Sequence, residues 1–271
     1  MLEIVGLRGF PEVRAGDDLG TLTRQSLRAS GRVLQDGDVL VFTSKIVSKA
    51  EGRVVDIESV EPSGLASTWA SQFDKDARLV EVVLQQARRV ARMDRGVLIA
   101  ETQHGFICAN AGVDRSNTGG AGEAILLPED PDASARRLRR AMLEPERSHE
   151  GHSPEGSASR GTAAPTDIAV IISDTFGRAW RLGQTNVAIG AAGIRAVHSY
   201  VGQQDPNGMT LHSTGIAVID ELAGAAELVM GKLDRVPVAL VRGYDYPRIP
   251  EGMPDEGASA LVRNATMDLF R

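Results

Sequence analysis

Short apolar runs alternate along the chain with longer amphipathic stretches, a pattern typical of an α/β protein. Uninterrupted apolar runs predict buried strands over Asp38–Thr43, Ile168–Ser173 and Val236–Arg242. Two further runs, Val97–Ala100 and Gly105–Ala109, flank a Gln-His-Gly turn and predict a β-hairpin. We therefore expect a fold in which strands and helices alternate.

Three amphipathic stretches predict helices. In Asp74–Met93 the apolar residues repeat at helical spacing, with arginines on the other faces. Asp132–Leu143 predicts a second, arginine-rich helix, whose arginines we interpret as a solvated face rather than a nucleic-acid patch. The third covers Thr214–Met230, where a hydroxyl residue can cap the start and Gly231 can close the end.

One segment differs sharply in composition. Pro145–Thr166 contains no Val, Ile, Leu or aromatic residue and is rich in Gly, Ser, Pro and charge. Such a segment cannot bury enough apolar surface to order itself, so we expect a flexible loop. His149 and His152 lie in it, but nothing there would hold them at a fixed geometry, and we interpret them as solvated rather than metal-binding.

The composition excludes several classes of protein. The chain has 271 residues, a net charge of −6 and 4% aromatic residues, which disfavours a dedicated nucleic-acid binder. No apolar run approaches the roughly 20 residues of a membrane span, and the N-terminus does not resemble a secretory signal. The single cysteine, Cys108, excludes an internal disulfide and reads as a buried thiol rather than a nucleophile. We expect a cytoplasmic protein that binds neither nucleic acid nor membrane.

Two polar runs follow predicted strands, where α/β proteins place ligand sites. In Asn110–Asn117 a carboxylate, Asp114, is flanked by amides, and these oxygens suit Mg²⁺ or Mn²⁺. In Ser173–Arg178 an aspartate and a threonine leave the strand together, followed by an arginine that could clamp an anion. Both runs are also rich in turn formers, so polar turns or helix caps are the alternative interpretation.

A third run, Thr43–Gly52, places two lysines and three hydroxyl residues after a strand. Lys49 could neutralise a polyphosphate, although a solvated strand exit is the alternative. No Walker motif is present, and Gly190–Gly193 is too short for a dinucleotide-binding fingerprint, so we interpret those glycines as structural.

Taken together and in order, these stretches resemble the coenzyme F420-0:L-glutamate ligase family from about Val5 to Gly243. The most specific segment is ISDTFGRAWRLGQTNVAIGAAG, Ile172–Gly193. The other matching segments are Ala15–Leu19, Asp36–Arg53, Ala109–Asn117, Asp205–Thr214 and Asp220–Lys232.

The resemblance implies an α/β (α+β) fold with mixed β-sheets, flanking helices and an intertwined homodimer. It implies one ligase unit over residues 1–271, or two interwoven subdomains, without the C-terminal flavin reductase domain of some actinobacterial relatives. The implied reaction uses GTP to join L-glutamate to the lactyl carboxylate of coenzyme F420-0, and later to γ-carboxylates. The implied cofactors are two divalent ions, Mg²⁺ or Mn²⁺, with K⁺ as a further family expectation.

The chemistry gives these requirements a reason. A carboxylate is a poor electrophile, and phosphorylation by GTP would convert it to an acyl phosphate that an amine can attack, releasing GDP and phosphate. Divalent ions would neutralise the charge that gathers during phosphoryl transfer. The alternatives are the same scaffold acting on another carboxylate acceptor, a non-catalytic GTP-binding protein, and a metal-dependent phosphohydrolase.

The resemblance also implies roles for residues. Asp114 and Asp174 correspond to ligands of one metal and Thr175 to a ligand of the second. Arg178, on our own inference, contacts phosphate or the deazaflavin phosphodiester. Asn186 stands where an acidic residue is common. The implied nucleotide contacts are Phe10, Pro11, Glu12, Val13, Ser44, Lys45, Lys49, Asn117, Met230, Gly231 and Lys232.

Overall fold

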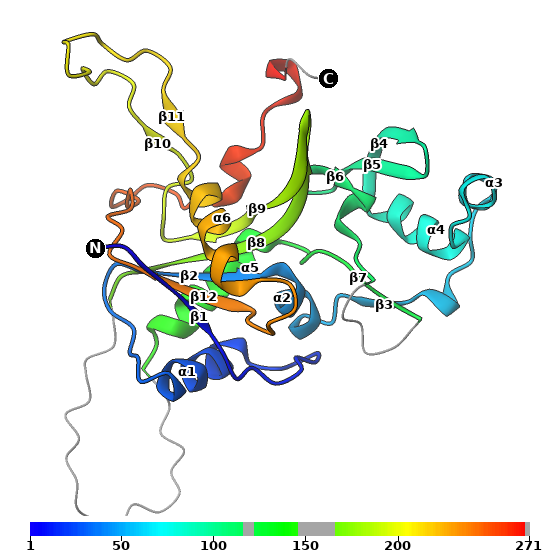
Figure 1. Ribbon diagram of the computed structural model, residues 1–271, viewed down its shortest axis with the longest axis horizontal. Helices are drawn as coiled ribbons and strands as arrows, with labels where there is room; N and C mark the ends of the chain where they lie inside the picture. Colours follow the sequence, from blue (N-terminus) through cyan, green and yellow to red (C-terminus); the bar gives the residue numbers. More distant parts are fainter. Residues whose placement is uncertain (116–121, 146–165, 269–271) are drawn as a thin grey trace, which may run out of the picture.

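A mixed five-stranded sheet forms the centre of the molecule (Figure 1). The computed structural model describes residues 1–115, 122–145 and 166–268. Neighbouring strands are antiparallel except for the parallel pair β2–β8. In sheet order the strands are β1 (Glu3–Leu7), β12 (Val238–Arg242), β2 (Asp38–Thr43), β8 (Ile168–Arg178) and β9 (Arg181–Ala192).

Helices cover both faces of this sheet, because its central strands bury side chains on both sides. Alternate residues of β2 enter two different cores: Leu40 and Phe42 one, Val39 and Val41 the other. The first core is closed by α1 (Leu19–Ala29), α2 (Ser44–Ala50) and α5 (Pro131–Leu143), and the second by α6 (Val218–Met230). The result is a three-layer arrangement of helix, sheet and helix.

A second group of elements has its own hydrophobic core and lies at the right in Figure 1. Helices α3 and α4 pack there against the antiparallel sheet β4–β5–β6, with the pair β3–β7 beside them. Its bounds are β3 (Val54–Asp56), η1 (Ile57–Ser59), α3 (Gly64–Phe73), α4 (Ala77–Gln86), β4 (Ala87–Asp94), β5 (Val97–Thr102), β6 (Ile107–Ala109), η2 (Asn110–Gly112) and β7 (Glu123–Ile125).

Two further features project from or cover this body. A narrow arm built on β10 (His198–Ser199) and β11 (Gly215–Ile216) extends away from the sheet (Figure 1). The C-terminal segment contains η3 (Ala258–Leu261) and η4 (Ala265–Met267). Within the described ranges, every helix falls short of the length and apolarity that crossing a membrane requires.

The strand predictions are confirmed, with one informative extension. Asp38–Thr43 is β2, and the predicted hairpin is the antiparallel pair β5–β6. The strand that starts at Ile168 continues to Arg178, although its parallel partner β2 ends at Thr43, opposite Ser173. Beyond that point β8 pairs with β9 alone. The two strands therefore continue beyond β2 as a two-stranded ribbon.

The predicted helix over Asp74–Met93 is wrong in its second half. Helix α4 ends at Gln86, and the arginine-rich residues that follow form strand β4, paired with β5. Arg89 Nε lies 2.7 Å from the buried Glu101 carboxylate on β5. Pairing and this ion pair outweigh a weak local helical pattern, because an isolated β5–β6 hairpin would leave a strand edge uncovered.

The other helices need smaller changes. Asp132–Leu143 is confirmed as α5, which begins one residue earlier at Pro131. Helix α6 starts at Val218, four residues later than predicted, because Gly215–Ile216 pairs in β11. Its last residue is Met230, and Gly231 caps it as predicted, with a φ of 60° that suits glycine. Of the predicted loop 145–166, all but the two end residues lie outside the described residues.

Asp18 caps helix α1 and provides a test of local stability. Its carboxylate accepts hydrogen bonds from the backbone N–H of Gly20 and Thr21 and from the Thr21 hydroxyl, at 2.9, 3.2 and 2.7 Å. The hydroxyl hydrogen bond, more than any other contact, holds the pKa of Asp18 below its usual value. We expect Asp18→Ala to lower the unfolding free energy by about 1 kcal/mol near neutral pH.

The sign of the pH dependence follows from the lowered pKa. The carboxylate contributes its stability above the unfolded-state pKa and loses it as pH falls through the lower, folded-state pKa. The difference between wild type and Asp18→Ala should therefore shrink in acid. Urea denaturation at neutral and acidic pH measures it, with Asp18→Asn as the control that keeps a capping side chain; a difference independent of pH would contradict this account.

Candidate active site

A cavity of about 950 Å³ opens where the β8–β9 ribbon leaves the sheet. Its walls come from the loop after β1, the start of α2, the η2 turn, the ribbon and the residues after α6. The fold thus gathers five segments that are far apart in sequence. The predicted site residues in the lining are Phe10, Pro11, Glu12, Val13, Ser44, Lys45, Lys49, Asp114, Asp174, Thr175, Gly231 and Lys232.

Asp174 is the first residue of β8 beyond the end of β2. The Ser44 hydroxyl donates a 2.7 Å hydrogen bond to its Oδ1 atom. Burial, with a smaller contribution from the nearby charge of Asp114, raises the pKa of Asp174 to about 6, although the hydrogen bond from Ser44 opposes the shift. A buried carboxylate with a second carboxylate nearby favours binding of a cation.

Asp114 reaches the cavity from a turn held by backbone pairing. It exchanges backbone hydrogen bonds of 2.9 and 2.7 Å with Ile125 at the end of β7. Its Oδ2 atom lies 2.8 Å from Lys45 Nζ. Gly112, two residues earlier, has a φ of 74°, and a Cβ there would lie 2.7 Å from the Leu127 side chain. That glycine therefore permits close packing against Leu127.

The two lysines lie on one face of α2, because they are four residues apart. The sequence predicts no secondary structure for these polar residues after the strand. In the structure they form a short helix that begins at Ser44. The Lys49 side chain is only 10% exposed and forms an ion pair with Glu12 from the first loop. Two ammonium groups therefore face one side of the cavity.

Thr175 belongs to a polar network on the opposite ribbon face. Its hydroxyl donates to Asn186 Oδ1 at 2.7 Å, and Asn186 Nδ2 donates to Glu227 Oε2 at 2.9 Å. Lys232 donates to the Thr175 hydroxyl and lies 3.3 Å from Glu227 Oε1. Asn186 is buried, so both ends of its amide are used.

Sequence reasoning missed Glu227 as a residue of this site. Glu227 lines the cavity from the last turn of α6, within the otherwise apolar run Ala225–Met230. A lone carboxylate in such a run, one helical turn before a predicted nucleotide loop, was the available signal.

Two predicted residues are placed elsewhere, and a third is not described by the structure. Met230 is fully buried in the core under the sheet, so its side chain does not line the cavity and the lining resumes at Gly231. Arg178 lies at the end of the ribbon, where its guanidinium donates to the Leu182 carbonyl at 3.2 Å, and it is not among the lining residues. Asn117 lies outside the described residues.

Cys108 is buried, as predicted, and lines the cavity. Burial, together with the charge of Asp174, raises the pKa of the Cys108 thiol to about 12. The thiol therefore stays protonated near neutral pH, which agrees with its interpretation as a packing residue rather than a nucleophile.

The chain is similar to known ligases over nearly its whole length. The family model described as F420-0:Gamma-glutamyl ligase matches residues 8–149 and 161–243. The coenzyme F420:L-glutamate ligase of Methanothermobacter thermautotrophicus is 39% identical over 271 residues, which is 100% of this chain and 99% of the relative. The protein of the same name from Methanopyrus kandleri is 40% identical over 96% of this chain and 94% of the relative. The protein of that name from Haloarcula marismortui is 37% identical over 100% of this chain and 96% of the relative.

Proposed function

The chain belongs to the F420-0:gamma-glutamyl ligase family, and from this premise we propose that it joins L-glutamate to coenzyme F420-0 in a GTP-dependent reaction. The observation that carries the proposal is the meeting of Asp114, Asp174 and Thr175 with Lys45 and Lys49 around one cavity. This combination offers oxygen ligands for divalent ions and ammonium groups for phosphates.

The residues present fit divalent metal. Asp114 and Asp174 are hard oxygen donors, and the raised pKa of Asp174 reflects the burial of its carboxylate. In the described residues no cluster of three or more His, Cys, Asp or Glu side chains is arranged to hold a metal. That sparse set suits Mg²⁺ or Mn²⁺, which keep waters and bind substrate phosphates alongside one or two carboxylates.

Asp114 and Asp174 would hold one ion and Thr175 the second, with K⁺ as a further cation of the proposal. When bound, the ions would neutralise charge on the transferring phosphoryl group. Lys45 and Lys49 neutralise the polyphosphate from the other wall, and the Ser44 hydroxyl keeps the Asp174 carboxylate oriented.

The proposed reaction has two steps. An oxygen of the acceptor carboxylate attacks the γ-phosphorus of GTP, forming an acyl phosphate and releasing GDP. The α-amine of glutamate, after losing a proton, then attacks the acyl carbon; the C–O bond to phosphate breaks, and inorganic phosphate leaves with an amide formed. The reaction requires the acceptor carboxylate and the γ-phosphate to lie side by side, and a single cavity lined by both carboxylates and lysines supports the proposal.

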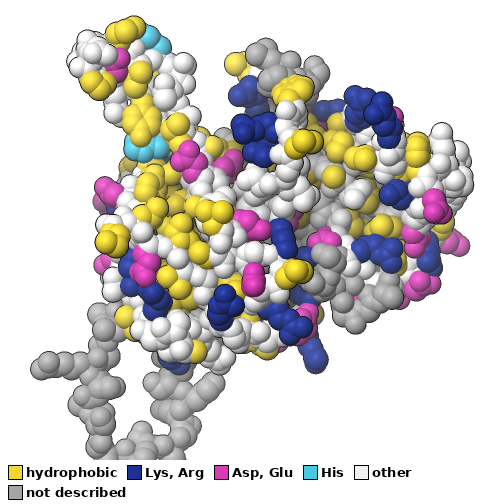
Figure 2. Space-filling view, viewed as in Figure 1, with side chains coloured by type: hydrophobic (Ala, Val, Ile, Leu, Met, Phe, Trp, Pro, Cys, Tyr) yellow, Lys and Arg dark blue, Asp and Glu magenta, His cyan; other side chains and the backbone are white. Residues whose placement is uncertain are grey.

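We include a homodimer in the proposal. The arm around β10 and β11 extends far from the body, and Figure 2 shows hydrophobic side chains along it. Val201 and Met209 on this arm are 58% and 70% exposed. Exposed apolar side chains on an extended arm favour a contact with a second copy. Light scattering coupled to size-exclusion chromatography should give twice the monomer mass, and a monomer would contradict this part.

A mass-spectrometric ligation assay tests the proposed function. The protein is combined with coenzyme F420-0, L-glutamate, GTP and Mn²⁺, with ATP and metal-free controls. We expect a mass gain of one or more glutamyl units that requires both GTP and metal. Tight GTP binding without product would favour the second candidate, the same chemistry on another carboxylate acceptor, and GTP turnover without glutamate would favour a phosphohydrolase.

Lys49 provides a separate test of the nucleotide wall. We expect Lys49→Met to raise the KM for GTP by about tenfold or more, because a buried charge-assisted contact with phosphate is lost. Its partner Glu12 is 69% exposed and would remain solvated, so the fold should survive. Steady-state kinetics with Lys75→Met, a lysine outside the cavity, as the control would measure the effect; equal KM values would remove Lys49 from the nucleotide site.

A further inference from the structure

A second hollow adjoins the cavity on the other side of Phe176. It measures about 270 Å³, and Phe176 lines both spaces. The hollow lies between β6, the β8–β9 ribbon and the C-terminal segment. Its lining residues are Gly105, Phe106, Ile107, Phe176, Val187, Ala188, Asp220, Leu261, Val262, Arg263 and Asp268.

Two phenylalanine rings form the inner wall. The centroids of Phe106 and Phe176 lie 6.1 Å apart in an edge-to-face arrangement, and His104 stacks on Phe106 at 5.9 Å. The Phe106 backbone is held at both ends: its N–H donates to Thr102 Oγ1 at 3.1 Å, and its carbonyl accepts from Thr102 N–H at 2.8 Å. The aromatic wall is thus fixed before any ligand binds.

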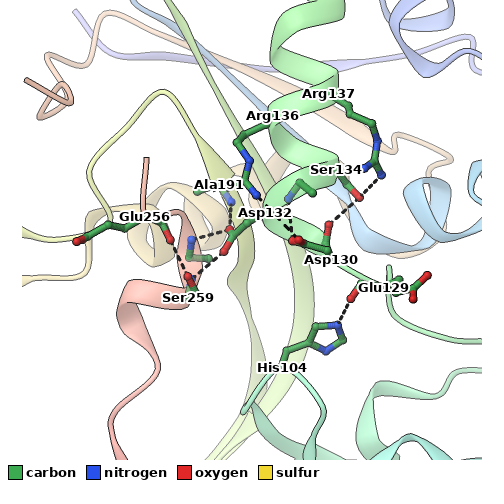
Figure 3. A network of polar contacts seen from close by, with 12 residues as sticks. His104, Glu129, Asp130, Asp132, Ser134, Arg136, Arg137, Ala191, Glu256 and Ser259 are labelled. Carbon is green, nitrogen blue, oxygen red and sulfur yellow. Dashed lines mark hydrogen bonds and ion pairs between the residues drawn. The ribbon is translucent and has the colours of Figure 1, made fainter. Parts of the chain in front are cut away.

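The outer wall is the C-terminal segment, and Asp132 anchors it. The Asp132 carboxylate accepts from the N–H groups of Ala258 and Ser259 at 2.7 and 3.1 Å, and from Ala191 on β9 at 2.9 Å (Figure 3). Farther along, a Cβ on Gly105 would lie 2.8 Å from Val262 Cγ1, so the segment packs directly on the β5–β6 turn. The hollow is therefore bounded on two sides by walls that packing and hydrogen bonds hold in place.

We propose that this hollow receives the planar deazaflavin ring of the acceptor. The inference rests on the proposed function and locates the acceptor within it. A flat aromatic ring suits a space walled by Phe106, Phe176 and Val262.

The path to the reacting carboxylate is short. Phe176 follows Asp174 by two residues on β8, so both side chains lie on one ribbon face, about 7 Å apart along the strand. An acceptor with its ring in the hollow therefore extends its carboxylate toward Asp174. The exposed Arg263 at the rim offers a guanidinium for the phosphodiester between ring and carboxylate.

Filling the hollow tests the inference. Val262→Trp should raise both the Kd and the KM for coenzyme F420-0 by about tenfold, equivalent to about 1.4 kcal/mol, and leave the KM for GTP unchanged. The fluorescence of the deazaflavin ring reports binding directly. Leu65→Trp is the matched control, because Leu65 is 59% exposed on α3 and lies outside both spaces.

A second variant covers the case in which tryptophan disturbs the fold. Arg263→Gln changes an exposed side chain and should raise the KM for coenzyme F420-0 about threefold. It should not alter binding of the deazaflavin riboside that lacks the phosphodiester. A raised KM for coenzyme F420-0 with unchanged binding of the riboside would indicate a lost phosphodiester contact rather than a disturbed fold.

The outcomes separate the two proposals. If wild type ligates glutamate to coenzyme F420-0 but both variants keep its Kd and KM, the hollow is not the acceptor site and the proposed function stands. If Val262→Trp does not fold, an unchanged KM in Arg263→Gln overturns the inference. If wild type neither binds nor ligates coenzyme F420-0, the proposed function and the inference fall together.

Discussion

Replacing Asp174 with asparagine is expected to lower kcat/KM for ligation by about 10² to 10³-fold, the largest effect on activity in this protein. The substitution removes a charge and almost no volume. Asparagine can still accept the 2.7 Å hydrogen bond from Ser44, so the ribbon and α2 should keep their positions. What is lost is the carboxylate that binds divalent metal under the proposed function.

The control for Asp174→Asn is Asp130→Asn. Asp130 caps α5 by accepting from Ala133 N–H at 2.8 Å, a role that asparagine performs equally well, and it does not line the cavity. Ligation rates at saturating metal, and Mn²⁺ binding followed by electron paramagnetic resonance, give two readouts. Wild-type turnover in Asp174→Asn, or unchanged Mn²⁺ affinity, would disprove the ligand role.

Replacing Gly190 with alanine is expected to cost about 3 kcal/mol or more of unfolding free energy, the largest effect on stability. A Cβ at this position would lie 2.4 Å from the Pro131 carbonyl oxygen and 2.5 Å from its carbon. Those are backbone atoms at the start of α5, which cannot move aside like a flexible side chain. Helix α5 and strand β9 would have to separate, opening the core between them.

Gly64→Ala is the comparison for this prediction, because a Cβ there meets nothing within 4 Å. Urea and thermal denaturation of both variants measure the difference, which should be near zero for Gly64→Ala. A melting temperature for Gly190→Ala within a degree or two of wild type would show that α5 shifts without cost. The interpretation of Gly190–Gly193 as structural predicts the opposite.

The strands could be predicted because their hydrophobic signal is continuous. Asp38–Thr43 and Ile168–Ser173 are buried on both faces, and four or five consecutive apolar residues leave few alternatives. The end of helix α4 at Gln86 could not be predicted. Residues 87–94, which follow it, are mostly exposed and carry no strong local preference for helix or strand. Their pairing partner, β5, decides their structure.

The site divides in the same way. Asp114, Asp174 and the lysines of α2 could be proposed from the sequence, because each lies in a polar run after an apolar stretch that predicts a strand, where α/β proteins place ligand sites. Glu227 could not, because its role depends on the amide of Asn186 and the ammonium of Lys232 meeting it across two elements. Met230 was assigned to the nucleotide loop, and only its packing under the sheet places it in the core.

By itself the sequence determined the family, the buried strands and the residue types of the site, since each of these is written in runs and spacings along the chain. The tertiary structure decided which of those residues share a space. Asp114 and Asp174 are 60 positions apart in sequence, and nothing local brings them together. They meet because β8 extends beyond the end of its partner β2, and the η2 turn packs beside the β8–β9 ribbon that this extension forms. Long-range pairing of this kind depends on the whole sheet closing, which no local pattern encodes.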